Sequence, residues 1–221
     1  MESHFEHELD SLKQRLLIMG SHAESAVSQA VQALARRDYD LALRVKSDDA
    51  ILDRFEVEID ELAIALLAKA PLASDLRLVT VAMKISQNLE RVGDEAAKIA
   101  KRARDLCKEA PLKLTLDLPR MATLAVGMLK AALDAFVQRD PAAARAVLPR
   151  DKEVNALHKN IQRQLVSHMT ADAEAIMRCL HLLTTVKCLE RIADHAKNIA
   201  EEVVYLCEAQ DIRHPGKRAT V

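Results

Sequence analysis

The sequence predicts an all-α protein made of two tandem, pseudo-symmetric three-helix bundles. Three observations support this fold class. Apolar residues recur at the three- and four-residue spacing of amphipathic helices over most of the chain. Only 4 glycines and 6 prolines occur among 221 residues, a composition typical of long helices. Sequence blocks of the first half also recur, in the same order, in the second half.

Three helical patterns occupy the first half of the chain. They cover residues 4–36, residues 39–69, and a third stretch that begins at Ser74 or Asp75, either of which can cap a helix N-terminus. Pro71 separates the second pattern from the third, because the residue before a proline avoids helical backbone. Three helices of this length can enclose a small apolar core.

The second half repeats this organisation after a linker. Residues 109–119 hold two prolines and no sustained apolar stripe, so we expect a non-helical connection there. Asp140-Pro141 starts the fifth pattern with an N-cap and a proline at the first helical position, and Pro149 should break or kink this helix early. Thr170 or Asp172 opens the last helix. The predicted helical stretches are residues 119–139, 140–169 and 170–207.

An internal repeat relates the two halves. The run Leu89-Glu-Arg-Val-Gly-Asp94 recurs as Leu189-Glu-Arg-Ile-Ala-Asp194. Upstream of these runs, Arg37-Asp38 recurs as Arg139-Asp140, and Asp49 recurs as Asp151, at nearly the same separation. Two blocks in the same order at a nearly constant separation indicate a duplicated unit.

The duplication sets the predicted domain boundaries. We expect a first three-helix repeat over residues 1–110 and a second over residues 111–212. Residues 213–221 are polar and contain Pro-Gly, so we expect a flexible tail there. When the two repeats are overlaid, Glu90 should lie on Glu190.

Composition and charge argue against several classes of function. The formal net charge is -1 and aromatic residues make up 2% of the chain, whereas nucleic-acid binders usually have a basic excess and aromatic stacking surfaces. No apolar run approaches the ~18 residues that span a bilayer, and the charged N-terminus differs from a signal peptide. We therefore expect a cytoplasmic protein, without nucleic-acid binding or membrane insertion, whose 4 cysteines stay reduced.

Carboxylates one helical turn apart flank the apolar stripe in both repeats. Glu90 and Asp94 lie on one face of the third predicted helix, and Glu190 and Asp194 occupy the matching positions of the last. Like charges at this spacing destabilise an isolated helix by a few tenths of a kcal/mol. Either basic side chains or a bound cation must offset this repulsion.

Neighbouring helices carry further acidic stripes. Two such stripes side by side form an oxygen-rich groove, and hard cations such as magnesium, calcium, manganese or iron prefer oxygen ligands. The stripe of the second repeat has an amide, Asn155, so metal binding there should be weaker or prefer another ion. In the first repeat the stripe is Asp49, Asp53, Glu56 and Asp60; in the second, Asp151, Asn155 and His158 face Glu190, Asp194, Asn198 and Glu202.

Three kinds of function are compatible with these stripes. The protein could be a regulatory interaction protein that holds metal ions, a metal-dependent enzyme with a carboxylate-bridged cluster, or a scaffold whose carboxylates form salt bridges. A di-iron carboxylate enzyme needs Glu-x-x-His on two helices, and no histidine here has a glutamate three residues before it. No Gly-rich phosphate loop or His-Glu-x-x-His pattern occurs either. We therefore predict no catalytic residues.

Three sequence runs resemble the PhoU family of phosphate-transport regulators. They are Pro71-Leu-Ala-Ser-Asp-Leu-Arg77, Leu89-Glu-Arg-Val-Gly-Asp94 and the run from Leu189 to Glu202, LERIADHAKNIAEE. Together with the duplication, the resemblance covers nearly the whole chain. It implies two pseudo-symmetric three-helix bundles that hold metal ions, such as iron, magnesium or manganese, on paired acidic motifs.

The resemblance also implies a function and a set of ligands. It implies a negative regulator that links the phosphate ABC transporter to its phosphate-sensing histidine kinase, often as a homodimer; we expect the ATPase subunit of the transporter to be the partner. Asn155 departs from the pattern where the first repeat has Asp53, and Gly93 becomes Ala193, which we interpret as a minor change. The implied metal ligands are Asp49, Asp53, Glu90, Asp94, Asp151, Glu190 and Asp194.

Overall fold

The computed structural model describes residues 4–69 and 72–213, and within these ranges the chain is helical apart from short connections. The predicted all-α class is confirmed. In chain order the elements are α1 (His4–Arg36), α2 (Tyr39–Leu67), α3 (Ala73–Cys107), α4 (Leu118–Gln138), α5 (Pro141–Val147), the 3-10 turn η1 (Leu148–Arg150), α6 (Asp151–Ala171), the 3-10 turn η2 (Ala173–Ala175) and α7 (Ile176–Glu208).

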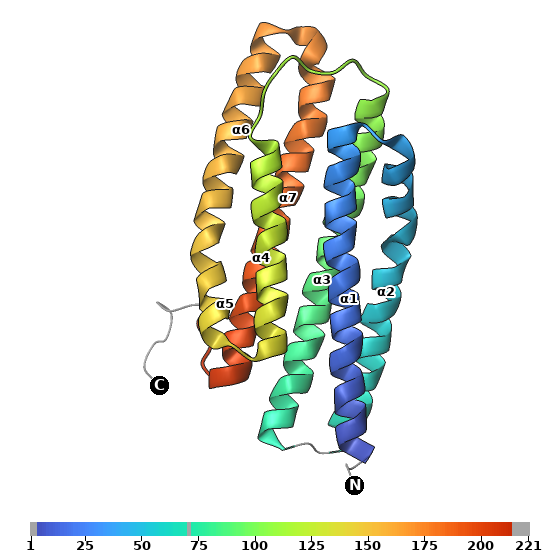
Figure 1. Ribbon diagram of the computed structural model, residues 1–221, viewed down its shortest axis with the longest axis vertical. Helices are drawn as coiled ribbons and strands as arrows, with labels where there is room; N and C mark the ends of the chain where they lie inside the picture. Colours follow the sequence, from blue (N-terminus) through green and yellow to red (C-terminus); the bar gives the residue numbers. More distant parts are fainter. Residues whose placement is uncertain (1–3, 70–71, 214–221) are drawn as a thin grey trace.

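The helices form two bundles that lie side by side along their long axes (Figure 1). α1, α2 and α3 make the first bundle, and α4 to α7 make the second. The third long helix of each repeat, α3 or α7, packs within its own bundle and also against its counterpart. α3 and α7 run in opposite directions where the two bundles meet (Figure 1).

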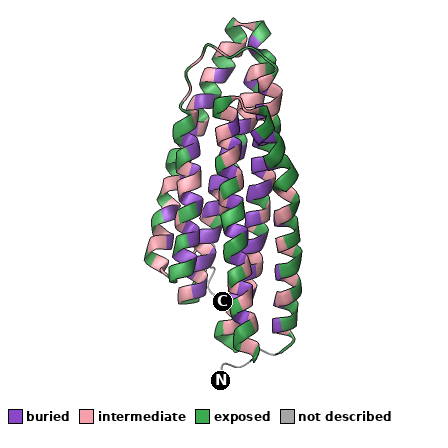
Figure 2. Ribbon diagram, turned by 45° about the vertical axis from the view of Figure 1, so that its right-hand side comes forward, coloured by how far each residue is buried: buried purple, intermediate pink, exposed green. Residues whose placement is uncertain are grey.

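The apolar cores of the two bundles are joined. Buried side chains line the inward faces of the helices (Figure 2), and those of both repeats form one connected cluster. α1 contributes Leu12, Leu16 and Met19 to it. The Leu133 side chain of α4 packs against the backbone of α1 at Gly20, since a Cβ built on Gly20 would lie 3.1 Å from it. The sequence predicts two units, and the structure packs them as one body.

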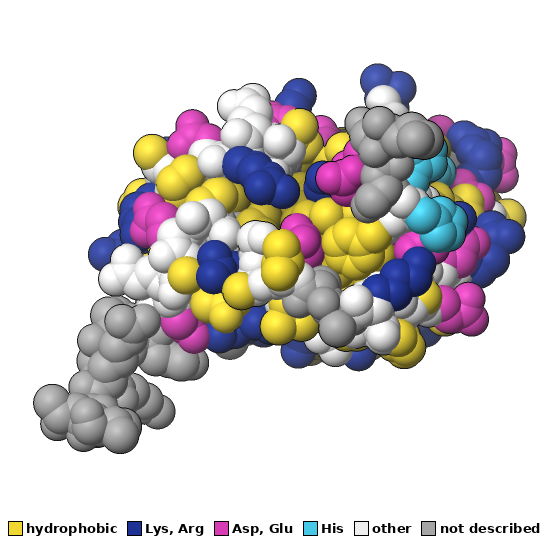
Figure 3. Space-filling model, turned by 90° about the horizontal axis from the view of Figure 1, so that it is seen from below, with side chains coloured by type: hydrophobic (Ala, Val, Ile, Leu, Met, Phe, Trp, Pro, Cys, Tyr) yellow, Lys and Arg dark blue, Asp and Glu magenta, His cyan; other side chains and the backbone are white. Residues whose placement is uncertain are grey.

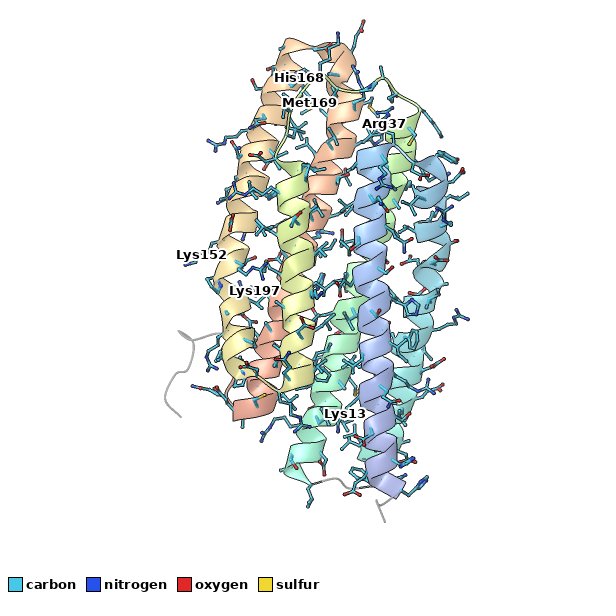
Figure 4. All side chains as sticks on the ribbon, viewed as in Figure 1. Lys13, Arg37, Lys152, His168, Met169 and Lys197 are labelled. Atoms are coloured by element: carbon cyan, nitrogen blue, oxygen red, sulfur yellow. The ribbon has the colours of Figure 1, made fainter. Side chains whose placement is uncertain are left out.

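The duplication is visible in the backbone of the two matching turns. Arg37 and Arg139 both have left-handed backbone, with φ of 54° and 50°. The aspartate that follows each arginine caps the next helix: Asp38 accepts a hydrogen bond from the Leu41 amide, and Asp140 accepts two from the amides that follow it. Arg37, labelled in Figure 4, also donates hydrogen bonds to backbone carbonyls where α3 ends.

Replacing Asp140 with alanine should therefore destabilise the protein. The Asp140 carboxylate accepts hydrogen bonds from the amides of Ala142 and Ala143, at 2.9 and 3.0 Å. Losing such an N-cap costs about 1 kcal/mol of unfolding free energy, measured by urea denaturation. Asp140→Asn keeps an acceptor at the same place and should stay close to the parent protein. Equal losses of unfolding free energy in the two variants would show that the hydrogen bonds accepted at position 140 contribute nothing to stability.

Several predicted helix boundaries need correction. α3 begins at Ala73 after Leu72 and has no side-chain cap, so neither Ser74 nor Asp75 caps it. Asp172 caps the short turn η2, and α7 starts after that turn. Pro149 does break the fifth predicted helix, because η1 separates α5 from α6. Pro71 and the tail from residue 214 onward lie outside the described residues.

The expectation that no segment is long and apolar enough to cross a membrane is wrong for α4. Among the described residues, α4 is both long enough and apolar enough to cross a membrane, with a mean hydropathy of 1.3. Half of this apolar stretch of α4 is buried inside the bundle. α4 contributes Met121, Met128 and Leu129 to the core. Burial against the other helices accounts for its apolar composition.

One end of the molecule exposes apolar side chains. Seen from the end at which α1 and α3 begin, they gather at the centre of the face, with charged side chains around them (Figure 3). Leu72, just before α3, and Leu76, in its first turn, are exposed. A cavity of about 200 Å³ between the helices is lined in part by Leu17 and Phe136. The joined core thus reaches the surface at this end.

Candidate metal grooves

Four of the predicted ligands come together between α2 and α3. Asp49 and Asp53 belong to α2, whereas Glu90 and Asp94 belong to α3. Asp49 is repelled by Asp53 and Asp94, and Glu90 by Asp94, Glu56 and Asp53, so the two acidic stripes face each other. We call this set of four carboxylates the first groove.

Gly93 allows α2 to approach α3 beside the first groove. A Cβ built on Gly93 would lie 2.3 Å from Cδ1 of the buried Leu52 and 3.5 Å from Oδ1 of Asp49. The interpretation of the change from Gly93 to Ala193 as minor concerns the second repeat and stays a prediction. Alanine at position 93 would require the end of the Leu52 side chain to move.

Two carboxyl groups of the first groove, those of Asp49 and Glu90, have pKa values above their ordinary values. Burial raises the pKa of Asp49, and repulsion from Asp53 and Asp94 raises it further. Burial also raises the pKa of Glu90, with Arg91 opposing and neighbouring carboxylates adding to the increase. A cation in the groove would relieve both the repulsion and the cost of burial.

Two basic side chains of α3 occupy the groove in this structure. Arg91 lies 3.3 Å from the Glu90 carboxylate and 3.5 Å from that of Asp94. Lys98 lies 3.7 Å from Asp94. The salt-bridge alternative is therefore partly realised, but these cations are about half exposed, so each pair contributes little to stability.

The residues present fit a hard cation, although they are not assembled around one. Oε2 of Glu90 is buried and makes no hydrogen bond within the described residues, although Nε of Arg91 lies 3.3 Å from it, and the available ligand atoms are all carboxylate oxygens. In the part of the chain that the structure describes, no three His, Cys, Asp or Glu side chains are grouped closely enough to hold a metal as they stand. A bound cation would have to displace Arg91 and draw the four carboxylates together.

The second groove, between α6 and α7, contains Asp151, Glu190 and Asp194. Asp151 is buried, accepts a hydrogen bond from Nδ2 of Asn155 at 3.2 Å, and lies 3.4 Å from Nζ of Lys197 (Figure 4). Its other oxygen, Oδ1, is buried without a hydrogen-bond partner among the described residues.

The carboxylates of Glu190 and Asp194 lie in the same groove, near enough to repel one another. Burial raises the pKa of Asp194, and repulsion from Glu190 and Asp151 adds to the increase. Glu190 pairs with Lys187 of the same helix. The second groove thus contains one amide and fewer carboxylates than the first, as the sequence predicts.

Two residues assigned to the second acidic stripe lie elsewhere. Glu202 is buried against α3, where Lys84 and Arg213 contact its carboxylate at 3.2 and 3.0 Å. Asn198 donates a hydrogen bond to Asn88, also on α3. Both therefore belong to the contact between the two repeats. His195, which follows Asp194, also makes a hydrogen bond to Asn88, through Nδ1 at 2.9 Å.

The sequence-based prediction missed Glu95. This carboxylate is buried where α3 crosses α7, and its Oε1 lies 2.9 Å from Nζ of Lys98 and 3.2 Å from Nη1 of Arg191. Burial raises the pKa of Glu95, but hydrogen bonds from Cys188, Lys98 and Arg191 outweigh burial and hold the pKa below its usual value. Its spacing from Leu89 and Val92 on the apolar stripe could have indicated its burial.

The raised pKa values predict how stability changes with pH in metal-free protein. A carboxyl whose pKa is higher in the folded state binds more protons when folded, so unfolding free energy falls as pH rises from its ordinary pKa through the raised value. Asp49, Glu90 and Asp194 act in this sense. Glu95, with its lowered pKa, contributes stability that is lost only at lower pH, as pH falls through its folded-state pKa.

We therefore expect Asp49→Asn combined with Glu90→Gln to flatten the pH dependence of stability above the ordinary carboxyl pKa. Urea unfolding in the presence of a chelator, repeated across the acidic to neutral range, measures the slope. Asp48→Asn combined with Glu61→Gln removes two exposed carboxylates of α2 and serves as the matched control. A slope that changes equally in both variants would contradict repulsion within the groove.

Comparison with known proteins finds one family. A sequence profile of the PhoU domain matches residues 16–103 and again residues 118–203, once in each repeat. A phosphate-specific transport system accessory protein PhoU homolog of Pseudomonas aeruginosa is 40% identical over 214 residues, which are 96% of this chain and 88% of the relative. The accessory protein PhoU of Escherichia coli is 37% identical over 213 residues, with the same coverage.

Solved structures agree with this result. The crystal structure of PhoU from Pseudomonas aeruginosa superposes with a TM-score of 0.91 at 39% identity, over 94% of this chain and 100% of that one. The phosphate transport system regulatory protein PhoU from Streptococcus pneumoniae superposes with a TM-score of 0.87 at 29% identity, over 95% and 99% of the two chains. The similarity therefore extends over both repeats.

Proposed function

The chain belongs to the PhoU family, and we propose that it is an accessory protein of phosphate-specific transport that restrains phosphate uptake and the phosphate-starvation response. The observation that carries this proposal is the full-length match of both repeats to proteins described as accessory to that transport system. The family consists of accessory and regulatory proteins, which agrees with the prediction that the chain is not an enzyme.

Regulation is proposed to act through protein contacts. The partners would be the ATPase subunit of the phosphate ABC transporter and a phosphate-sensing histidine kinase, and the protein would act in the cytoplasm without inserting into the membrane. We also propose that it forms a homodimer. The relatives' description as accessory to a transport system supports an association with the transporter.

The two grooves are proposed to hold metal ions such as iron, magnesium or manganese. Asp49, Asp53, Glu90 and Asp94 would hold metal in the first groove. Asp151, Glu190 and Asp194 would do so in the second. The bound ion would neutralise clustered carboxylates and fix α2 against α3. The buried Oδ1 of Asp151, which has no hydrogen-bond partner in the part of the chain that the structure describes, supports this assignment.

Deleting the gene tests the regulatory proposal. In a strain without a second copy, the phosphate-starvation response should become active in high phosphate, and a plasmid copy of the gene should repress it again. Affinity capture from phosphate-replete cells, with this protein as bait, should recover the ATPase subunit and the kinase. An unchanged response in the deletion strain would contradict the proposal.

A further inference from the structure

Three pairs of repeat-related residues meet where α3 and α7 pack against each other. They are matched by the same separation along the chain that places Glu90 on Glu190. The pairs are Asn88 with Cys188, Arg91 with Arg191, and Glu95 with His195. The last pair exchanges a carboxylate for an imidazole, so the two repeats differ in charge at this contact.

The two members of the last pair make corresponding contacts with the opposite helix. Glu95 of α3 accepts a hydrogen bond from the thiol of Cys188 on α7. His195 of α7 makes a hydrogen bond to Asn88 of α3 at 2.9 Å. Because Cys188 and Asn88 are themselves matched positions, His195 occupies in the second repeat the place that Glu95 occupies in the first.

Arg191 reaches across this contact to the other repeat. Its Nη1 lies 3.2 Å from Oε1 of Glu95, a buried carboxylate of α3. In the second groove, the neighbouring Glu190 carboxylate pairs with Lys187. The second groove therefore has a lysine beside its carboxylates, while its arginine is held by the opposite helix.

The matching Arg91 instead stays with the carboxylates of its own groove. It lies 3.3 Å from Glu90 and 3.5 Å from Asp94, although it is also near enough to His195 for its charge to act on the imidazole ring. An imidazole carries no negative charge in either protonation state. It therefore cannot hold a guanidinium across the contact as the Glu95 carboxylate does.

We propose that His195 is a positioning residue that leaves Arg91 in the first groove as a resident counter-ion, which a metal ion must displace. The inference rests on the proposed metal binding. In the second groove Glu95 holds the matching Arg191 away, so a metal ion there does not compete with an arginine. The exchange of glutamate for histidine thus determines which groove contains its own guanidinium.

Replacing His195 with glutamate supplies the missing carboxylate and tests the proposal on the full-length protein. Glu190→Gln combined with Asp194→Asn disables the second groove, so that calorimetric titration with Mg²⁺ reports on the first groove alone. In this background, His195→Glu should move Arg91 from the first groove to the contact with α7. We expect Mg²⁺ to bind about three- to tenfold tighter, a modest gain because the lost ion pairs of Arg91 are partly exposed.

Two controls separate the movement of Arg91 from the charge that the substitution adds. Arg91→Gln should by itself tighten Mg²⁺ binding, and His195→Glu should then bring no further gain. Asn198→Glu adds the same charge about one helical turn further along α7 and should leave Mg²⁺ affinity close to that of the background. An equal gain from His195→Glu with and without Arg91, or an equal gain from Asn198→Glu, would overturn the proposal.

The reverse change tests the same rule in the second groove. Glu95→Gln, combined with Glu90→Gln and Asp94→Asn so that only the second groove binds, should release Arg191 toward its own groove. We expect Mg²⁺ to bind about three- to tenfold more weakly than without Glu95→Gln. Unchanged or tighter binding would contradict the proposal. This measurement decides the question if circular dichroism shows that the His195→Glu variant does not fold.

A metal-free crystal structure of the His195→Glu variant distinguishes failure of this inference from failure of the proposed metal binding. Arg91 in contact with the introduced carboxylate supports the inference, and Arg91 still beside Glu90 contradicts it. If Arg91 moves but the parent binds no Mg²⁺, the proposed metal binding is wrong and the placement of Arg91 stands. If Mg²⁺ binds the parent and His195→Glu leaves its affinity unchanged, the grooves stand and the role of His195 is wrong.

Discussion

Adding Mg²⁺ or Mn²⁺ to the purified protein is expected to raise its melting temperature, and the double substitution Glu90→Gln/Asp94→Asn is expected to abolish that rise. A ligand that binds only the folded state, at a hundred times its Kd, adds about 2.7 kcal/mol of stability. For a chain of this size that corresponds to a rise of roughly 5–10 °C.

The metal-free form of this variant should be about as stable as the metal-free parent, or slightly more stable. Removing the charges of Glu90 and Asp94 relieves their repulsion with Asp49 and Asp53, while the lost pairs with Arg91 are exposed and contribute about 1 kcal/mol or less. Glu190→Gln with Asp194→Asn should reduce the metal effect by less, because Asn155 already weakens the second groove. If the first variant unfolds without metal, its carboxylates are structural salt-bridge partners.

Leu89→Ala is expected to lower the free energy of unfolding by about 2–5 kcal/mol, the range for truncating a fully buried leucine. Leu89 is 0% exposed and belongs to the apolar cluster that joins the two repeats. Because the cluster is continuous, we expect one unfolding transition that moves as a whole to lower denaturant concentration.

Leu43→Ala provides the control for this experiment, since Leu43 lies on α2 with 45% of its surface exposed. That substitution should change stability by less than about 0.5 kcal/mol. Circular dichroism and a fluorescent probe in the second repeat should report the same midpoint for Leu89→Ala. Two separate transitions would show that the repeats unfold independently and that the joined core contributes little to cooperativity.

Helix periodicity and repetition predicted most of this fold, because both act through local spacing. The bounds of α1 agree with the prediction, and Asp140 caps its helix as expected. The start of α3 was mispredicted, because Ser74 and Asp75 have the residue type of a cap but lie inside the helix. Residue type alone does not determine which of several neighbouring polar residues ends up at the boundary.

The candidate site was predictable in part. The spacing of Glu90 and Asp94 placed them on the correct face of α3, toward α2. Glu202 was misplaced, because helical spacing gives the face of a residue but not the neighbour that packs there, and its partner Lys84 comes from the other repeat. The close approach at Gly93 also depends on tertiary packing, which a single sequence does not specify.

Complementation of the deletion strain tests the central claim most directly, because that claim joins regulation to the groove carboxylates. The parent gene should restore repression of the phosphate-starvation response in high phosphate. The Glu90→Gln/Asp94→Asn variant, expressed at the same level and folded, should leave the response active, whereas Asp48→Asn with Glu61→Gln should repress it normally. If the groove variant represses the response as fully as the parent, the carboxylates of the first groove are not needed for regulation and the account is wrong.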